Sequence, residues 1–126
     1  MRALRILLVE DEPVIAQHVR HLLEKKGHRV LQAKESEELK PLCDQFHPNI
    51  AILNFKQAKR TNGVALANSL LQKSNLLILL LTGARSKDMY ASEAYQPTFP
   101  ILYKPFTPKQ LLNAVVELSE RLDIGK

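Results

Sequence analysis

Five short apolar runs, separated by helix-like patterns, constrain the fold of this chain most strongly. They occupy residues 6–9, 30–31, 50–53, 76–81 and 101–103. Continuous rather than alternating hydrophobicity is typical of strands that are buried on both faces of a parallel sheet. Because runs and helical segments alternate, the pattern predicts an α/β fold. The expected architecture is a doubly wound, five-stranded parallel sheet with helices on both faces.

The helical segments carry start and stop signals. They are expected from residue 13, over residues 36–46, from residue 62, over residues 86–95 and from residue 108. Pro13 suits the first turn of a helix, and Gly27 is typical of a residue just past a helix end. Thr107 is expected to cap the last helix, with Pro108 at its first position. The segment 86–95 is the weakest, because it has no clear apolar stripe.

Chain length and apolar content bound the class of protein. The 126 residues predict a single domain over residues 1–126. The one cysteine, Cys43, excludes an internal disulfide and predicts a small buried side chain. The longest apolar run is far shorter than the ~20 residues of a membrane helix. Acidic residues as early as Glu10 and Asp11 interrupt any signal-peptide pattern, so a cytoplasmic protein without membrane contact is expected.

The net charge of +5 raises the question of a nucleic-acid or acidic protein partner. The basic residues are scattered, however, and no nucleic-acid-binding motif or interleaved aromatic residue accompanies them. A solvated basic surface is therefore favoured, and direct nucleic-acid binding through the basic stretch 56–60 is kept as an alternative. No nucleophile–base pair or cofactor loop indicates an enzyme with its own substrate.

Polar residues gather where the predicted strands end. Glu10 and Asp11 follow the first strand, Asn54 ends the third, Thr82 ends the fourth, and Lys104 follows the fifth. In a doubly wound sheet this edge carries the ligand site. Carboxylates supply hard oxygen ligands for Mg²⁺, whereas a hydroxyl and an ammonium can contact phosphoryl oxygens. The set therefore predicts a pocket for a divalent cation and a phosphoryl group.

Three segments make a family resemblance clear. Residues 8–13 (LVEDEP), 80–84 (LLTGA) and 103–106 (YKPF) resemble the signature segments of two-component response regulator receiver domains of the chemotaxis, CheY-like type. The resemblance extends from about residue 4 to residue 122. It implies a flavodoxin-like strand order, 2-1-3-4-5, and a cis peptide bond between Lys104 and Pro105.

The resemblance also implies roles for the pocket residues. Asp11 would be the principal ligand of Mg²⁺, with Glu10 assisting. Thr82 would be the hydroxyl of the switch, and Lys104 would pair with the phosphoryl group. The position that matches the phosphoacceptor aspartate is Asn54.

Asn54 alters the expected chemistry. A carboxylate attacks phosphorus to form a mixed anhydride, but an amide oxygen is a poor nucleophile, so this step is expected to fail. Three acids and one lysine would sum to −2, whereas the two acids Glu10 and Asp11 with Lys104 sum to −1. We therefore expect any Mg²⁺ binding to be weakened.

Other positions also depart from the family. Ala58 replaces a typical proline, the loop 56–63 is one residue longer and basic, and residues 96–97 (QP) replace a typical Gly-Ala. Ile101 stands where the family has its switch aromatic. Tyr103 is close, but we expect its side chain on the opposite face. Several departures together favour natural divergence over an engineered change at Asn54.

The sequence thus predicts a divergent receiver that acts as a protein-interaction module rather than through phosphorylation at position 54. By the resemblance, its partners would be a histidine kinase, a phosphotransfer protein or an output protein. The fourth helix, fifth strand and last helix would form the contact face, which would also serve a homodimer. The alternatives are a phosphoacceptor receiver in which Asn54 is engineered, and a basic nucleic-acid-binding module.

Overall fold

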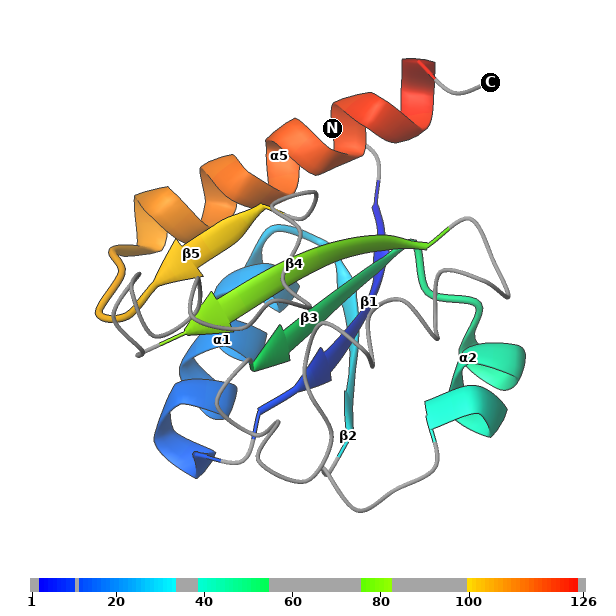
Figure 1. Cartoon of the computed structure of the whole chain (residues 1–126), viewed down its shortest axis with the longest axis horizontal. Helices are drawn as coiled ribbons and strands as arrows, with labels where there is room; N and C mark the ends of the chain where they lie inside the picture. Colours follow the sequence, from blue (N-terminus) through cyan, green and yellow to red (C-terminus); the bar gives the residue numbers. More distant parts are fainter. Residues whose placement is uncertain (1–2, 11, 34–38, 55–75, 83–99, 125–126) are drawn as a thin grey trace, which may run out of the picture.

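A five-stranded, all-parallel sheet forms the centre of the computed structural model, which describes residues 3–10, 12–33, 39–54, 76–82 and 100–124. The strand order is β2-β1-β3-β4-β5 (Figure 1). The strands are β1 (Arg5–Val9), β2 (Arg29–Ala33), β3 (Ile50–Asn54), β4 (Leu77–Thr82) and β5 (Ile101–Tyr103). The predicted fold class and the implied strand order are both confirmed.

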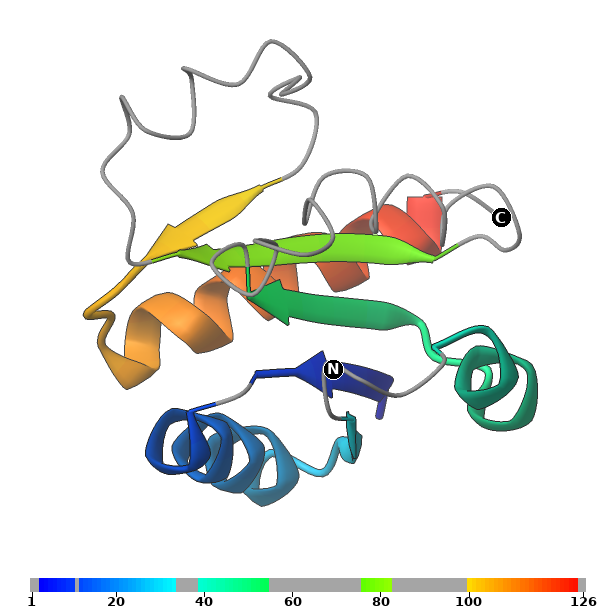
Figure 2. The ribbon, with the colours of Figure 1, turned by 60° about the horizontal axis from the view of Figure 1, so that its bottom comes forward.

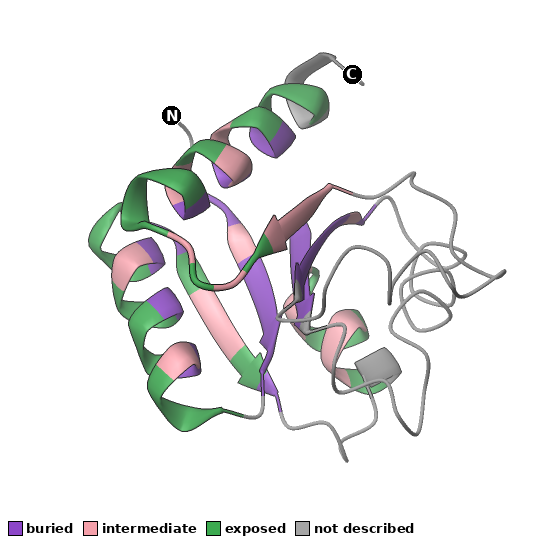
Figure 3. Cartoon of the chain, turned by 60° about the vertical axis from the view of Figure 1, so that its left-hand side comes forward, coloured by how far each residue is buried: buried purple, intermediate pink, exposed green. Residues whose placement is uncertain are grey.

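In the described ranges, three helices cover the two faces of the sheet. They are α1 (Pro13–Lys25), α2 (Leu39–Phe46) and α5 (Pro108–Ile124). Figure 3 shows α1 and α5 on one face and α2 on the other, and Figure 2 shows α5 running beside β4 and β5. The helices expected from residue 62 and over residues 86–95 lie outside the described residues. None of the helices in the described ranges has the length and apolar character needed to span a membrane.

Pro41 lies within α2, in the segment 36–46 that the sequence predicts to be helical. The helix is described from Leu39 to Phe46, and residues 36–38 of the predicted segment lie outside the described residues. The Pro41 side chain is exposed on this helix.

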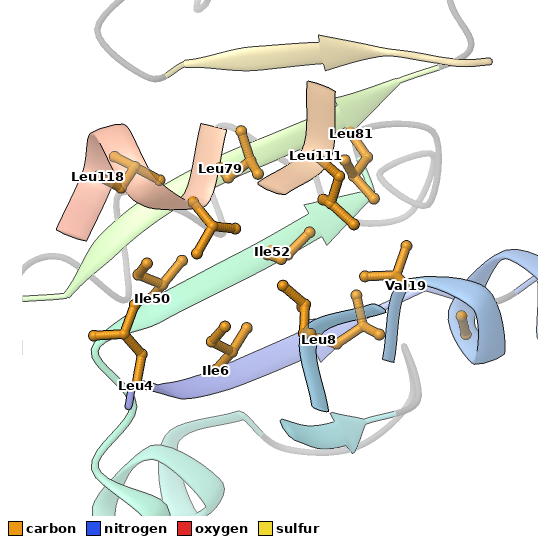
Figure 4. Packing of buried hydrophobic residues seen from close by; sticks show 13 residues of the cluster. Leu4, Ile6, Leu8, Val19, Ile50, Ile52, Leu79, Leu81, Leu111 and Leu118 are labelled. Atoms are coloured by element: carbon orange, nitrogen blue, oxygen red, sulfur yellow. The ribbon is translucent and has the colours of Figure 1, made fainter. Parts of the chain in front are cut away.

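The sheet separates two apolar clusters because successive strand residues point to opposite faces. The larger cluster joins the sheet to α1 and α5 (Figure 4). Its members are Leu4, Ile6, Leu8, Ala16, Val19, Leu23, Ile50, Ile52, Leu79, Leu81, Leu111, Val115 and Leu118. The smaller cluster packs against α2 and contains Leu7, Val9, Ala33, Ala51, Leu53, Leu76, Ile78 and Leu80. Strands with apolar residues on both faces explain the continuous runs in the sequence.

Cys43 belongs to α2 and packs with Leu42 against the smaller cluster. Its side chain is half-buried rather than fully buried. Burial raises the pKa of the Cys43 thiol, which disfavours the reactive thiolate. The predicted role of a small apolar side chain agrees with this environment.

The ends of α1 and α5 show the expected caps. Gly27 has a φ of 92°, and its N–H donates to the carbonyl of Glu24 at 2.9 Å, which closes α1. At the start of α5, the Gln110 N–H donates to Thr107 Oγ1 at 3.1 Å. The Thr107 N–H in turn donates to Gln110 Oε1 at 2.8 Å. This reciprocal capping box fixes where the chain enters α5 after β5.

His28 ties the end of α1 to the start of β1. Its side chain is buried, with 4% exposed, and Nδ1 accepts a hydrogen bond from the Leu4 N–H at 3.0 Å. The Arg29 N–H donates to the Leu4 carbonyl at 2.8 Å, so both backbone groups of Leu4 are engaged. Within the described part of the chain, His28 Nε2 has no hydrogen-bond partner. Burial lowers the pKa of His28 and favours the neutral imidazole.

Two valines of α1 provide a matched test of the larger cluster. Val19 is fully buried, whereas Val14 is 80% exposed in the same helix. We expect Val19→Ala to lower the free energy of unfolding by about 2 kcal/mol, because methyl groups are lost from a packed site. Val14→Ala should change it by less than about 0.5 kcal/mol. Urea denaturation of both variants checks this; equal losses would contradict the packing described.

Candidate functional site

Four of the predicted pocket residues lie at one edge of the sheet. Glu10 directly follows β1 and Lys104 directly follows β5, while Asn54 and Thr82 are the last residues of β3 and β4. Asn54 pairs in register with Leu81, one residue before Thr82. Because all strands are parallel, these ends face the same side of the molecule, where the arrowheads of Figure 1 converge. Asp11 lies outside the described residues.

An ion pair between Glu10 and Lys104 is the clearest feature of the site. Lys104 Nζ lies 2.9 Å from Glu10 Oε2. The Glu10 side chain has no exposed area, and that of Lys104 is 13% exposed. The other oxygen, Glu10 Oε1, accepts a hydrogen bond from the Glu12 N–H at 3.1 Å. A buried carboxylate is thus held by a cation and a backbone amide, which together compensate for its loss of water.

Glu12 is a second acid beside Lys104 that the sequence analysis missed. Its Oε1 lies 3.8 Å from Lys104 Nζ, and its side chain is 54% exposed. The pocket charge derived from the sequence therefore omitted one nearby carboxylate. Its signal was available, because Glu12 lies two residues after Glu10 and precedes the helix-starting Pro13. Solvent exposure limits its contribution.

The donor chemistry of the site suits Mg²⁺ only in part. Carboxylate oxygens are the ligands that Mg²⁺ prefers, and Glu10 places two of them at the strand edge. Each of these oxygens already accepts a hydrogen bond, one from Lys104 and one from Glu12. In the described residues, no group of three or more His, Cys, Asp or Glu side chains could hold a metal ion. A divalent cation would therefore compete with Lys104 for Glu10.

The segment that carries Lys104 has the expected peptide geometry, but one predicted side-chain direction is wrong. The Lys104–Pro105 peptide bond is cis, as the resemblance implied. Ile101 packs against the smaller cluster, whereas Leu102 packs against the larger one on the opposite face. Because strand residues two apart share a face, Tyr103 lies on the face of Ile101 and not on the opposite one. Its exposed ring is therefore near the position of the missing switch aromatic.

The fold and the strand-end residues define a class: a flavodoxin-like α/β domain with a buried acid after β1 and a lysine after β5. Comparison with known families then identifies the chain. The family profile of the response regulator receiver domain matches residues 6–116, so the chain belongs to this family. The family consists of signalling domains of two-component systems.

Characterised relatives support this assignment. The chain is 26% identical over 126 residues to the aerobic respiration control protein ArcA of Escherichia coli, covering 99% of this chain and 52% of ArcA. It is 29% identical over 116 residues to the phyllosphere-induced regulator PhyR of Methylorubrum extorquens, covering 90% of this chain and 42% of PhyR. The chain therefore spans about half of the relatives it matches.

A solved structure agrees with the fold over its full length. A response regulator receiver domain protein from Clostridium thermocellum matches with a TM-score of 0.80 and 25% identity. The match covers 98% of this chain and 99% of that one. The described part of the chain therefore has the fold of this receiver domain.

Proposed function

We propose that this receiver domain is not phosphorylated at position 54 and acts as a protein-interaction module in a two-component pathway. The observation that carries the proposal is the Glu10–Lys104 ion pair beside a strand that ends in Asn54. In this arrangement Lys104 pairs with Glu10, and the position of the phosphoacceptor is occupied by the neutral residue Asn54. The charges of Glu10 and Lys104 then balance without a phosphoryl group.

The proposal assigns a role to each pocket residue. Asn54 would stand at the acceptor position as a neutral amide in place of a carboxylate. Glu10 and Asp11 would hold a weakly bound Mg²⁺, which would neutralise phosphoryl oxygens when present. Thr82 and Lys104 would contact the phosphoryl group of a competent site. In the absence of a phosphoryl group, Lys104 contacts Glu10.

The partner face in this proposal includes β5 and α5. The exposed Tyr103 lies at the end of β5, and the outer face of α5 is exposed, as Figure 3 shows. A signalling protein, namely a histidine kinase, a phosphotransfer protein or an output protein, would bind here, and a second copy of the chain could use the same surface. Signalling would then depend on binding rather than on a phosphorylation-driven change of state.

The test is the intact mass of the protein after incubation with Mg²⁺ and a small-molecule phosphodonor. We expect no phosphoryl adduct on the chain as given. Asn54→Asp should acquire one, because a carboxylate oxygen can form the bond to phosphorus while the donor's leaving group departs. Asn49→Asp is the matched control, since Asn49 precedes the opposite end of the same strand. That control should remain unmodified.

The other outcomes separate the remaining functions. An adduct on the unchanged chain would overturn the proposal and restore the phosphoacceptor receiver with a neighbouring acceptor group. If neither the unchanged chain nor Asn54→Asp acquired a phosphoryl adduct, the whole pocket, and not only position 54, would be unable to support phosphorylation. Signalling that Asn54→Asp restores together with phosphorylation would contradict the interaction-only function.

A further inference from the structure

The fold gathers basic residues at the edge of the sheet opposite to the pocket, although they are scattered in the sequence. Lys25 and Lys26 end α1, Arg29 begins β2, and Arg5 begins β1. Arg5 and Arg29 are register partners in adjacent strands, so their backbones lie side by side. These four residues are named here the basic edge. Three of them are exposed and Arg5 is half-buried.

Both arginines of the basic edge are held by the end of α2. Arg5 Nε donates a hydrogen bond to the His47 carbonyl at 2.7 Å. The Arg29 guanidinium lies over the Phe46 ring, 6.0 Å from its centroid. Carbonyl groups at a helix C-terminus carry partial negative charge, which favours cations there. The two guanidinium groups are therefore oriented by uncharged partners.

Among the described residues, no acid forms an ion pair with a member of the basic edge. The ion pairs between described residues join Arg20 to Glu24, and Lys104 to Glu10 and Glu12. None of them involves Arg5, Lys25, Lys26 or Arg29. Four like charges at one edge create a positive potential that repels within the protein but attracts an anionic partner. An ordered arginine pair also matches the planar geometry of carboxylates.

We propose that the basic edge is a second docking surface, which binds an acidic polypeptide segment rich in Asp and Glu. An acidic polypeptide fits better than a nucleic acid, because the described residues of this short edge offer no uncovered aromatic face for base stacking. Phe46, the aromatic ring of this edge, is already covered by Arg29. The inference does not rest on the pocket, which lies at the other edge of the sheet.

The test is fluorescence anisotropy with a labelled oligoglutamate peptide at low salt. Lys25→Gln/Lys26→Gln should weaken binding about tenfold, because two partly exposed ion pairs are lost. The control Lys109→Gln/Arg121→Gln removes the same charge from exposed positions of α5, outside the edge. It should weaken binding by less than about twofold. Circular dichroism of each variant verifies that the fold is retained.

Three results would overturn the proposal. If both double variants lost the same affinity for the peptide, net charge alone would explain binding and the basic edge would have no special role. If the unchanged protein did not bind the peptide at low salt, the basic edge would not be a docking surface for acidic segments. Tighter binding of an oligonucleotide of matched charge, with the same loss in Lys25→Gln/Lys26→Gln, would assign the edge to nucleic acid instead. Asn54→Asp should leave peptide binding unchanged, so failure here is distinguishable from failure of the pocket proposal.

Discussion

Replacement of Lys104 by methionine is expected to lower the free energy of unfolding by about 3 kcal/mol. The variant keeps an apolar stem of similar length but leaves the Glu10 carboxylate buried without its cation. Removing one member of a buried pair costs more than the pair itself contributes, because the remaining charge stays out of water. Chemical denaturation at neutral pH measures the loss.

Two further variants test this explanation. Glu10→Gln/Lys104→Met removes both charges and should recover most of the stability lost in Lys104→Met. Glu12→Gln should cost less than about 0.5 kcal/mol, since Glu12 is more than half exposed and lies 3.8 Å from the ammonium. A larger loss in Glu12→Gln than in Lys104→Met would show that the wrong acid has been assigned as the main partner.

Lys104→Met should also respond more strongly to Mg²⁺ than the unchanged chain. In the unchanged protein a cation must displace the ammonium from Glu10. Without the lysine this competition disappears, and a ligand that binds the folded state raises its stability. The midpoint of thermal unfolding, recorded with and without Mg²⁺, checks the difference between the two proteins. An equal response would contradict competition at Glu10.

Acidification is expected to destabilise the protein through His28. Burial lowers the pKa of His28 in the folded state below its ordinary value of 6.5. Between the two pKa values, the unfolded chain binds a proton at His28 that the folded chain does not bind. The free energy of unfolding therefore falls as pH decreases from 6.5 toward the lowered pKa of the folded state. Above 6.5 the contribution is constant. The slope of this loss approaches about 1.4 kcal/mol per pH unit for one proton.

A substitution by asparagine separates this effect from other acid-sensitive groups. His28→Asn retains an acceptor for the Leu4 N–H but cannot take up a proton. The stability of His28→Asn relative to that of the unchanged chain should therefore rise as pH falls through 6.5. His18→Asn, which replaces an exposed histidine of α1, is the matched control for the substitution itself. Parallel curves for both variants would refute a special role of His28.

Much of the fold was predictable because local signals and burial agree. The five apolar runs mark strands with both faces covered, and Thr107, Pro108 and Gly27 mark helix ends by their own backbone preferences. The prediction of α2 was less direct, because its segment contains Pro41, a residue that the interior of a helix disfavours.

The site was predictable in position but not in its contacts. Parallel strands bring Glu10, Asn54, Thr82 and Lys104 to one edge, and that follows from topology alone. Which acid Lys104 contacts depends on side-chain geometry, and the sequence analysis did not consider Glu12. The face of Tyr103 was mispredicted although strand alternation determines it. The basic edge could not be predicted from the sequence, because it depends on the strand register that places Arg5 beside Arg29.

The Glu10–Lys104 contact has a consequence for how the protein acquires its pocket. The two residues are 94 positions apart, and β5, which carries Lys104, is at the far side of the sheet order from β2. Closing so long a segment of chain costs entropy that only later contacts repay. Glu10 therefore remains without this partner during synthesis until the last strand has emerged and docked. The ion pair is a reporter of completed folding, and a partner that recognises the closed pocket would distinguish finished molecules from nascent ones.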